Sequence, residues 1–329
     1  VKLNNVEIPG TVTAIGDYAF WNCKALHTQI GENVKSIGGY AFYGCSSLDN
    51  QTFPTTLTSI GSGAFMNCTA FTEINIPQNV TSIGDSAFSG CSSVTAITLE
   101  EGLKTIGSGA FCNINKVTKI TIPTTVTSMG KGLFSGMSAL EELTIPFVGR
   151  DQYISPSRGD NSESNKHYPL GYMFGNSSYT GSVAVRQYYT YDYIYSETYY
   201  EYGASYTEQY YIPTTLKTVT VTNAKYIFYG AFSYLYSNSS TGSTKTSPLN
   251  ITTINLNEGI KRIGSYAFAS YNHYSEAYKG YTSYQYITSN LENVNLPSTL
   301  TYISDSAFYN CVKLNNVEIP GTVTAIGDY

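Results

Sequence analysis

The sequence has few of the residues on which catalysis, nucleic-acid binding and membrane insertion depend. Charged residues make up only 12% of its 329 residues, and there are three histidines and one tryptophan. The 23 acidic residues outnumber the 18 lysines and arginines, which argues against the basic surface that nucleic-acid binding requires. No run of 18 apolar residues occurs, so we expect no segment to span a membrane.

One pattern is repeated along most of the sequence. A clear copy is residues 71–91, Phe-Thr-Glu-Ile-Asn-Ile-Pro-Gln-Asn-Val-Thr-Ser-Ile-Gly-Asp-Ser-Ala-Phe-Ser-Gly-Cys. The phenylalanine near the end of each copy recurs at steps of 22 or 23 residues and returns three times after two interruptions, at Phe20, Phe42, Phe65, Phe88, Phe111, Phe134, Phe232, Phe268 and Phe308. A fixed period of this length is typical of a solenoid, in which each copy buries its apolar face against its neighbours.

Each copy contains two strand signals and a third segment after a glycine. Apolar and polar residues alternate in Ile74-Asn75-Ile76, which is typical of a half-buried strand, and Pro77 ends it. Residues 80–84 predict a short second strand. Residues 85–91 begin with polar residues that suit a helix N-cap, and they predict one or two helical turns. Stacked copies would therefore form a parallel sheet with short helices on the opposite face.

The pattern Leu-x-x-Ile-x-Ile-Pro-x-x-Val-Thr-x-Ile-Gly-x-x-Ala-Phe-x-x-Cys resembles the BspA-type leucine-rich repeat of microbial surface proteins. The resemblance implies an α/β repeat solenoid, a right-handed leucine-rich-repeat stack with tyrosine-rich loop insertions. It also implies a cell-surface or secreted protein that adheres to an extracellular protein or glycan. The motif residues are packing residues, so the resemblance assigns none of them a role in ligand binding.

The two ends of the sequence repeat each other. Residues 1–18 and 312–329 are identical, although neighbouring copies agree only at their patterned positions. We therefore expect a fragment of a longer chain, without its signal peptide, in which 311-residue units occur in tandem. We expect one solenoid domain over 1–329, with regular repeats in 1–146, loop-bearing repeats in 147–311 and the start of the next unit in 312–329. Ends without polar capping repeats predict end-to-end self-association.

Five cysteines occupy one position of the repeat. They are Cys23, Cys45, Cys68, Cys91 and Cys311, each three residues after the repeat phenylalanine. Other copies carry Ile114, Met137, Leu235 and Tyr271 at this position, which favours buried free thiols that act as small apolar groups. A disulfide ladder and a zinc site are the alternatives. Cys112 lies outside this position, and the pattern assigns it no role.

Catalytic patterns are missing. His27, His167 and His273 lie in unrelated parts of the sequence, with no nucleophile or metal-ligand spacing around them. The glycines recur with the repeat and serve turns, so they do not form a phosphate-binding loop. The sequence therefore predicts a protein that is not an enzyme and has neither a cofactor nor a metal site.

Long insertions interrupt the repeats between Phe134 and Phe232. Residues 170–175 look like a degenerate copy, so we expect the solenoid to continue there, with loops at 147–168 and 177–211. Smaller loops are expected at 236–250 and 269–290. Of the 32 tyrosines, 15 lie between residues 147 and 212. Insertions of this kind often emerge on one face of a repeat protein and form its binding surface.

Three groups of residues are candidates for binding. Tyrosines offer large contact areas at low entropic cost, but alternating Tyr191, Tyr193 and Tyr195 are equally typical of a β-hairpin strand packed on the flank of the stack. The candidate tyrosines are Tyr188, Tyr189, Tyr191, Tyr193, Tyr195, Tyr274, Tyr278, Tyr281 and Tyr284. Arg158, Gly159 and Asp160 form a tripeptide that resembles integrin-binding loops. The alternative is coincidence, because a match of only three residues also arises by chance.

The third group is the outward row of the first strands. It consists of Glu7, Thr52, Asn75, Thr98, Thr121, Thr144, Thr220, Asn255, Asn295 and Glu318. This row could bind an extended glycan or peptide, or simply solvate the sheet. Together the patterns predict a non-catalytic binding or adhesion module. The alternative is a structural spacer made of tandem units.

Overall fold

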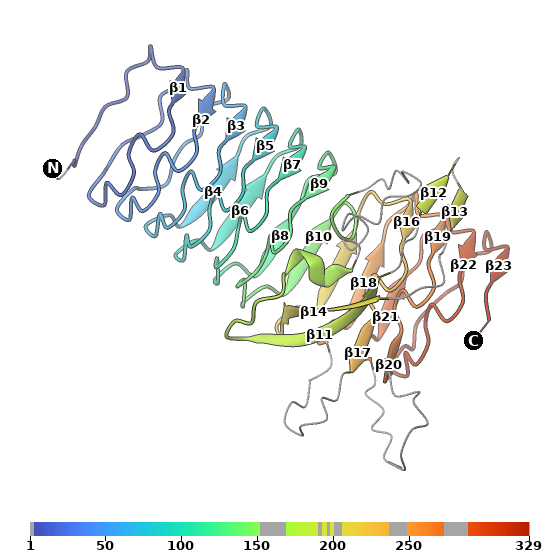
Figure 1. The fold of residues 1–329 in the computed structure, drawn as a ribbon. Coiled ribbons are helices and arrows are strands. Elements are labelled where there is room, and N and C mark those ends of the chain that lie inside the picture. Colours follow the sequence, from blue (N-terminus) through green and yellow to red (C-terminus); the bar gives the residue numbers. More distant parts are fainter. Residues whose placement is uncertain are drawn as a thin grey trace. The chain divides into compact units, whose positions relative to one another are not determined.

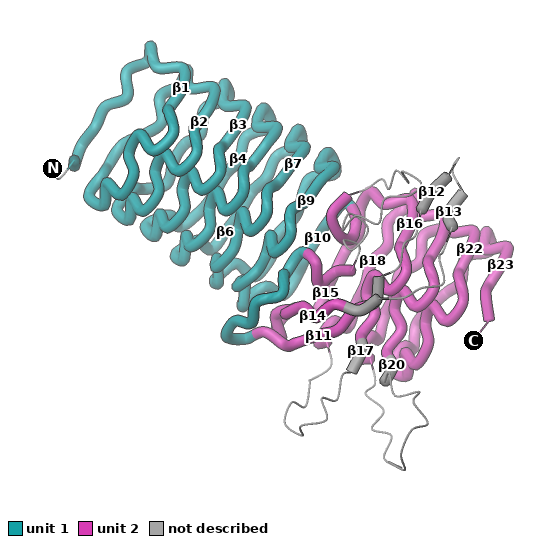
Figure 2. Tube along the Cα trace, viewed as in Figure 1, with its two compact units in different colours: residues 1–146, 173–181 teal, residues 147–172, 182–329 magenta. Residues whose placement is uncertain are grey.

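The structure is a computed structural model that describes residues 3–151, 169–189, 193–195, 198–200, 206–236, 249–272 and 289–328. At residues 188, 189, 193–195, 198–200, 206, 207, 235, 236, 271 and 272 only the backbone is described. The chain divides into two compact units (Figure 2). The first unit consists of residues 1–146 and 173–181, and the second of residues 147–172 and 182–329.

In the first unit, successive copies of the repeat are successive coils joined by two sets of parallel strands (Figure 1). The second strand of each copy belongs to a six-stranded sheet of β1 (Ala14–Ile15), β2 (Ser36–Ile37), β3 (Ser59–Ile60), β5 (Ser82–Ile83), β7 (Thr105–Ile106) and β9 (Ser128–Met129). The first strands pair as β4 (Glu73–Ile76) with β6 (Ala96–Leu99), and β8 (Lys119–Thr121) with β10 (Glu142–Ile145). Ile60 lies beside Ile83 and Ile83 beside Ile106, so the register advances by one period per coil.

The second unit repeats this arrangement. Its first strands are β15 (Thr218–Val221), β18 (Thr253–Leu256) and β21 (Asn293–Asn295). Its second strands are β16 (Tyr226–Ile227), β19 (Arg262–Ile263), β22 (Tyr302–Ile303) and β23 (Ala325–Ile326). The prediction of a repeat solenoid with parallel strands is confirmed. Its right-handed sense and the single domain stay predictions.

The core of each unit contains a file of stacked phenylalanine rings. In the first unit, the ring centroids of Phe42, Phe65 and Phe88 are 5.2 and 5.3 Å apart, with interplanar angles of 5° and 7°. In the second unit, Phe268 stacks on Phe232 at 5.4 Å and on Phe308 at 5.0 Å. The first unit also confirms the degenerate copy, because Phe174 packs on Phe134 at 5.8 Å. Each ring thus buries its faces against the coil before and the coil after it.

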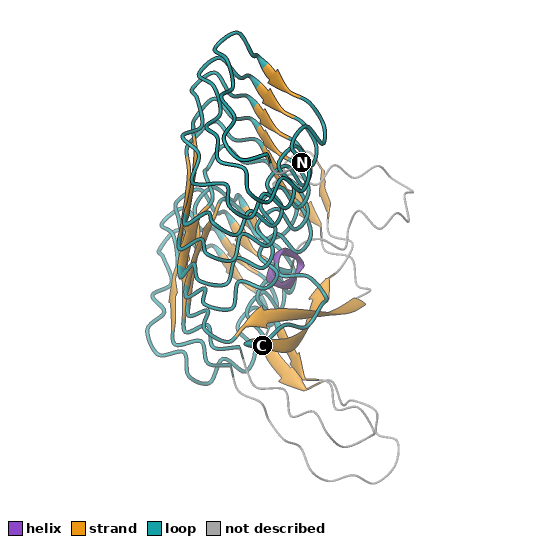
Figure 3. Ribbon diagram, turned by 90° about the vertical axis from the view of Figure 1, so that its left-hand side faces the viewer, coloured by secondary structure: helices purple, strands orange, loops and turns teal. Residues whose placement is uncertain are grey.

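The predicted short helices are wrong. The segments after the glycine are consecutive turns, and the one helix among the described residues is the 3-10 helix η2 (Leu170–Met173), shown in Figure 3. In the Phe88 coil, the backbone N–H groups of Ala87 and Ser89 bond within the coil, to Gly84 O at 3.3 Å and Ser86 O at 3.1 Å. Between them the N–H of Phe88 donates to Ala110 O of the next coil, at 2.9 Å. Alternate N–H groups therefore form turns and an inter-coil ladder.

Left-handed residues explain why no helix forms. In the first unit, the residues two before and two after the phenylalanine have positive φ, as in Ser86 (55°) and Gly90 (77°), or Tyr40 (54°) and Gly44 (69°). An α-helix requires negative φ throughout, so two left-handed residues in five end it on both sides of the phenylalanine. The polar residue at the start does not cap a helix either. Asp85 Oδ1 accepts the backbone N–H of Ser108 in the next coil, at 2.7 Å.

Four of the five repeat cysteines bond to the preceding coil, whereas Cys23 Sγ donates to Trp21 O in its own coil. Cys68 Sγ donates to Phe42 O and Cys91 Sγ to Phe65 O, both at 3.2 Å, and both side chains are fully buried. All six cysteines are free. Cys112, one residue after Phe111, is partly buried, and desolvation raises the pKa of its thiol. The predicted burial of the thiol position is confirmed for Cys45, Cys68 and Cys91, but Cys23 and Cys311 are only partly buried.

Burial makes these thiols poor nucleophiles, which gives a first prediction. Desolvation raises the pKa of Cys45 to about 11 and that of Cys91 to about 12, from an ordinary value of 9.0. We expect the buried thiols to react with a disulfide reagent at pH 8 only after urea is added. The folded state retains protons that the unfolded state loses, so the contribution of these thiols to the free energy of unfolding should be constant below pH 9 and fall between pH 9 and about 12. Equal reaction rates for all six thiols in the native protein would contradict this.

Candidate functional site

The tyrosine-rich insertion at 177–211 is a β-hairpin where it is described. Strand β11 (Ser182–Tyr189) pairs antiparallel with β14 (Tyr206–Pro213), from Ser182 opposite Pro213 to Tyr189 opposite Tyr206. Strands β12 (Tyr193–Tyr195) and β13 (Thr198–Tyr200) also pair antiparallel. The backbone of Tyr193 and Tyr195 therefore lies in a hairpin, and the packing of this hairpin on the flank of the stack stays a prediction.

Buried side chains attach the base of this hairpin to other segments of the second unit. Gln187 has an exposed fraction of 0%, and its Nε2 donates to Ser233 O at 2.9 Å. Its Oε1 accepts the backbone N–H of Gly171 at 2.6 Å. Tyr210 on the opposite strand is also fully buried, with its ring so close to Gly171 that a Cβ there would lie 2.5 Å from it. Gly171 thus leaves room for Tyr210, and both strands are anchored.

The hairpin is continuous with the repeats of its unit through a mixed sheet. Strand β11 pairs antiparallel with β17 (Tyr234–Tyr236) at Arg186 and Leu235, and β17 pairs in parallel with β20 (Ser270–Asn272). Strand β17 begins two residues after Phe232, and β20 two residues after Phe268. The segments that follow these two phenylalanines therefore form strands, and these strands belong to the same sheet as the hairpin (Figure 1).

The structure places some of the predicted site residues on this hairpin. The backbones of Tyr188 and Tyr189 lie in β11, and those of Tyr193 and Tyr195 in β12. The other predicted residues lie outside the described ones: Arg158, Gly159, Asp160, Tyr191, Tyr274, Tyr278, Tyr281 and Tyr284. Gln187 and Tyr210 were not predicted as anchors from the sequence. Gln187 could have been found, because a polar side chain follows the alternation Val183, Val185 at an inward position.

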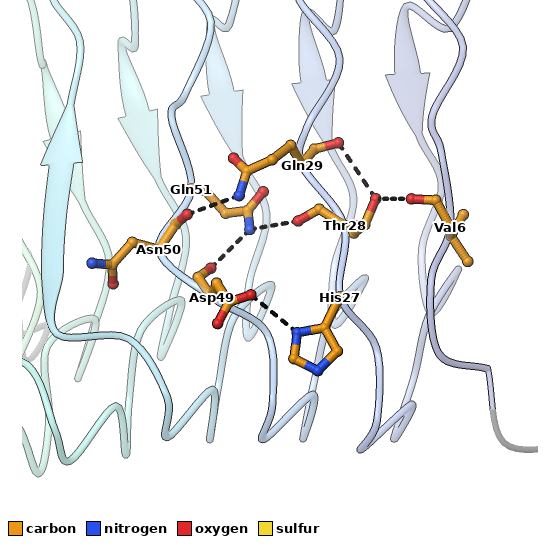
Figure 4. A network of polar contacts seen from close by, with 7 residues as sticks. All are labelled: Val6, His27, Thr28, Gln29, Asp49, Asn50 and Gln51. Carbon is orange, nitrogen blue, oxygen red and sulfur yellow. Dashed lines mark hydrogen bonds and ion pairs between the residues drawn. The ribbon is translucent and has the colours of Figure 1, made fainter.

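A polar network replaces regular strand pairing at the third coil of the first unit (Figure 4). Gln51 is 6% exposed, at the inward position that Ile74 and Ile97 occupy in later coils. Its Oε1 accepts the backbone N–H of Ile30 at 3.0 Å, and its Nε2 donates to Thr28 O at 3.0 Å. The side-chain amide thus takes the place of a peptide group of the ladder.

Asn50 bonds to the following coil through its side-chain amide. Its Oδ1 accepts the N–H of Thr72 at 2.8 Å, and its Nδ2 donates to Thr72 Oγ1 at 2.8 Å. A groove of about 340 Å³ opens beside it. Phe53, Ile76 and Pro77 line its apolar part; Asn50, Gln51, Thr52, Glu73, Asn75, Thr98 and Glu100 line the rest. No ion pair of Glu73 or Glu100 occurs among the described residues.

The groove contains part of the predicted outward row. Thr52, Asn75 and Thr98 are exposed there and offer hydroxyl and amide groups to solvent. In the second unit the same row bonds internally instead: Asn295 Nδ2 donates to Asn255 Oδ1, and Asn255 Nδ2 to Thr220 Oγ1 at 3.1 Å. The row therefore solvates and cross-links its sheet in the second unit, and it is accessible along the groove in the first.

None of the histidines, cysteines and carboxylates of the described residues gather in groups of three or more that could hold a metal ion. Among the same residues, no helix has the length and apolar character needed to cross a membrane.

Several solved structures are similar to the chain in sequence and backbone. Among solved structures, a leucine-rich cell-surface protein from Faecalibacterium prausnitzii is similar, with 25% identity over 98% of this chain and 69% of that one, and a TM-score of 0.41. A leucine-rich repeat protein from Bacteroides ovatus has 22% identity over 98% and 74%, with a TM-score of 0.42. One from T. pallidum has 31% identity over 44% and 70%, also with a TM-score of 0.42.

The family is established by sequence. No curated protein matches the chain at a significant level. The family model described as the BspA type leucine rich repeat region matches in six copies, over residues 1–72, 58–154, 192–282 and 279–329. These matches cover well over half of the sequence and include both sets of regular repeats. The chain therefore belongs to the BspA-type leucine-rich repeat family.

Proposed function

We propose that the chain is a non-catalytic binding module, displayed at a cell surface or secreted, that recognises an extracellular protein or glycan. Its contact surface is the tyrosine-rich hairpin within 147–211, together with the loop at 269–290. The observation that carries this proposal is the anchored hairpin base: Gln187 and Tyr210 are fully buried, so the backbone that leads to the tyrosines is fixed to the repeats. A contact surface on a rigid support loses little conformational entropy on binding.

Composition supports recognition by this insertion. Of the 32 tyrosines, 12 lie in the insertion at 177–211. Tyrosine combines an apolar ring with a hydroxyl and has only two side-chain torsions, which suits both protein and carbohydrate surfaces. The competing function is a spacer that holds another domain away from the cell. A spacer has no need of tyrosines concentrated in one insertion.

A hairpin-shortened variant tests this proposal. Because Tyr189 and Tyr206 are opposite each other in the antiparallel register, residues 190–205 can be replaced by Asn-Gly, a two-residue hairpin turn. We expect ligands that the full chain binds on a glycan and matrix-protein array to bind the variant with an affinity that is lower by about tenfold or more. The thermal midpoint should be unchanged, since the anchors remain.

Control variants separate the hairpin from the rest of the surface. Asp160→Ala removes the carboxylate of the Arg-Gly-Asp tripeptide and tests integrin adhesion alone. Glu73→Gln removes a charge at the groove of the first unit without changing the size of the side chain. Full binding by the shortened variant, or an array without any ligand for the full chain, would favour the spacer.

A further inference from the structure

The groove beside Asn50 lies where the regular pairing of the first strands is interrupted. The second coil is one residue short, because Val34 follows Leu26 by eight residues instead of the nine found in the next coils. In the third coil, the side chains of Asn50 and Gln51 bond to the neighbouring coils in place of a strand ladder. Strand β4 is the edge of its two-stranded sheet, and the groove of about 340 Å³ opens along that edge.

Small polar side chains line the middle of the groove, and a carboxylate lies at each of its two sides. Thr52, Asn75 and Thr98 are the outward residues of three successive coils, and all three are exposed. Glu73 is the first residue of β4, whereas Glu100 directly follows β6. The two strands are parallel and in register, so these carboxylates lie at opposite ends of the strands. Three coils about 4.8 Å apart span about 10 Å, the length of about three extended residues.

The carboxylates at the groove lack a cationic partner, whereas the same row is neutralised further along the unit. At the position of Glu73, strands β8 and β10 have Lys119 and Glu142, whose Nζ and Oε2 are 2.7 Å apart. At the position of Glu100, the coil of β8 has Pro123. Among the described residues, none bonds to the carboxylate of Glu73 or Glu100, and both side chains are exposed. The groove is therefore a negatively charged part of this surface.

The apolar part of the groove indicates which kind of cation it suits. Phe53, Ile76 and Pro77 line it beside the carboxylates. Arginine and lysine side chains have apolar stems that pack on such a surface while their charged groups stay in contact with water. The guanidinium of arginine also donates five N–H groups, which match the carboxylate, hydroxyl and amide oxygens of the groove. A basic side chain therefore complements both parts of the groove.

Other classes of ligand fit this groove less well. The metal-binding residue types of the described chain form no group of three or more at which a metal ion could be held. A neutral glycan would leave the charges of Glu73 and Glu100 uncompensated. It would also find little aromatic surface for stacking, because Phe53, the one aromatic residue that lines the groove, is only 7% exposed.

We propose that this groove binds a basic peptide segment of a protein partner. The segment lies extended across the three coils, and the stem of an arginine covers Ile76 and Pro77. Its guanidinium donates to the carboxylates of Glu73 and Glu100. The groove belongs to the first unit and the tyrosine-rich hairpin to the second, so this inference adds a second binding site and does not rest on the proposed function.

Titration of the isotope-labelled full chain with short capped peptides tests this proposal. The probe is acetyl-Ala-Arg-Ala-Arg-Ala-amide, and its control has glutamine in place of both arginines. We expect the arginine peptide to shift the backbone amide resonances of Thr52 and Thr98 and to bind about tenfold more tightly than its control. The affinity should fall as the salt concentration is raised, because the interacting charges are exposed.

Matched variants separate the charge of the groove from its shape. Glu73→Gln or Glu100→Gln should weaken binding about threefold, and the double variant about tenfold. Glu142→Gln removes the same charge from the same row outside the groove, so it should leave the affinity unchanged. Asn75→Trp should block the groove, whereas Thr121→Trp places the same side chain two coils further along the row and should not.

Several results would overturn the proposal. They are an arginine peptide that does not bind, equal binding of the two peptides, and a loss with Glu142→Gln as large as with Glu73→Gln. Preferential binding of a neutral oligosaccharide such as chitotriose at the same amides would also overturn it. All substituted side chains are exposed, so each variant should keep the wild-type thermal midpoint. The hairpin-shortened variant should bind the peptide like the full chain, which distinguishes this site from the proposed contact surface.

Discussion

Replacing Phe88 with alanine is expected to lower the free energy of unfolding of the first unit by about 3–5 kcal/mol. The side chain is fully buried, and its ring lies between those of Phe65, at 5.3 Å, and Phe111, at 6.0 Å. Its removal loses the apolar transfer free energy and leaves a cavity on both sides. The ladder through the N–H of Phe88 holds the neighbouring coils in place, so we expect little collapse of this cavity.

Phe20→Ala is the matched control for this substitution. Phe20 occupies the same position in the first coil, but it is only partly buried and stacks on Phe42 alone in this file, at 5.1 Å. We expect less than half the loss that Phe88→Ala causes. Urea unfolding measured by circular dichroism gives both values, with the slope checked for a two-state transition. Equal losses at the two positions would show that the coils do not support each other from both sides.

Gln51→Leu is the second substitution with a large expected effect, although it exchanges side chains of similar size. The change removes the acceptor for the N–H of Ile30 and the donor to Thr28 O and Asp49 O. Gln51 is 6% exposed, so water cannot easily replace these bonds. An unsatisfied buried backbone group costs about 1–3 kcal/mol, and we expect a total loss of about 2–5 kcal/mol.

Gln29→Leu controls for the chemistry of this substitution at an exposed position. The Gln29 amide also bridges backbone groups, since its Nε2 donates to Asn50 O at 3.0 Å and its Oε1 accepts the N–H of Thr52 at 3.3 Å. Solvent reaches these groups, so we expect a loss below about 1 kcal/mol. Urea unfolding is again the measurement. A stable Gln51→Leu variant would mean that the coils can close the gap and pair as regular strands.

The sequence was sufficient to predict the strands, the phenylalanine file and the buried thiols. Each of these depends on a side chain of one type at one position of a fixed period, as with Ile74, Phe88 and Cys91. Such residues face the same neighbours in every coil, because stacking repeats the environment together with the sequence. The repeated sequence pattern therefore predicts how these side chains pack between coils.

The helices were predicted wrongly because local propensity competed with the ladder between coils. Residues such as Asp85, Ser86 and Ala87 suit the start of a helix, yet each coil gains more by directing alternate N–H groups to its neighbour. The sequence does contain the contrary signal. Asparagine or glycine stands two residues after the phenylalanine at Asn22, Gly44, Asn67, Gly90, Asn113, Gly136 and Asn310, and these residue types tolerate positive φ best.

The candidate site was less predictable, because its parts do not follow the period. Gln187 bonds to Gly171 and Ser233, residues that are distant from it in the sequence and belong to different coils. Nothing in the local pattern specifies those partners. The groove beside Asn50 depends on a similar exception, since Gln51 stands where the next two coils have Ile74 and Ile97. A polar residue at an inward position is the signal that could have indicated it.

The central claim, that successive copies are successive coils, can be tested most directly by nuclear Overhauser effects between selectively labelled phenylalanine rings. The ring centroids of Phe42 and Phe65 are 5.2 Å apart, and those of Phe65 and Phe88 5.3 Å. We predict cross-peaks between each of these pairs and none between Phe42 and Phe88. Absence of cross-peaks between phenylalanines one period apart would contradict the stacked arrangement.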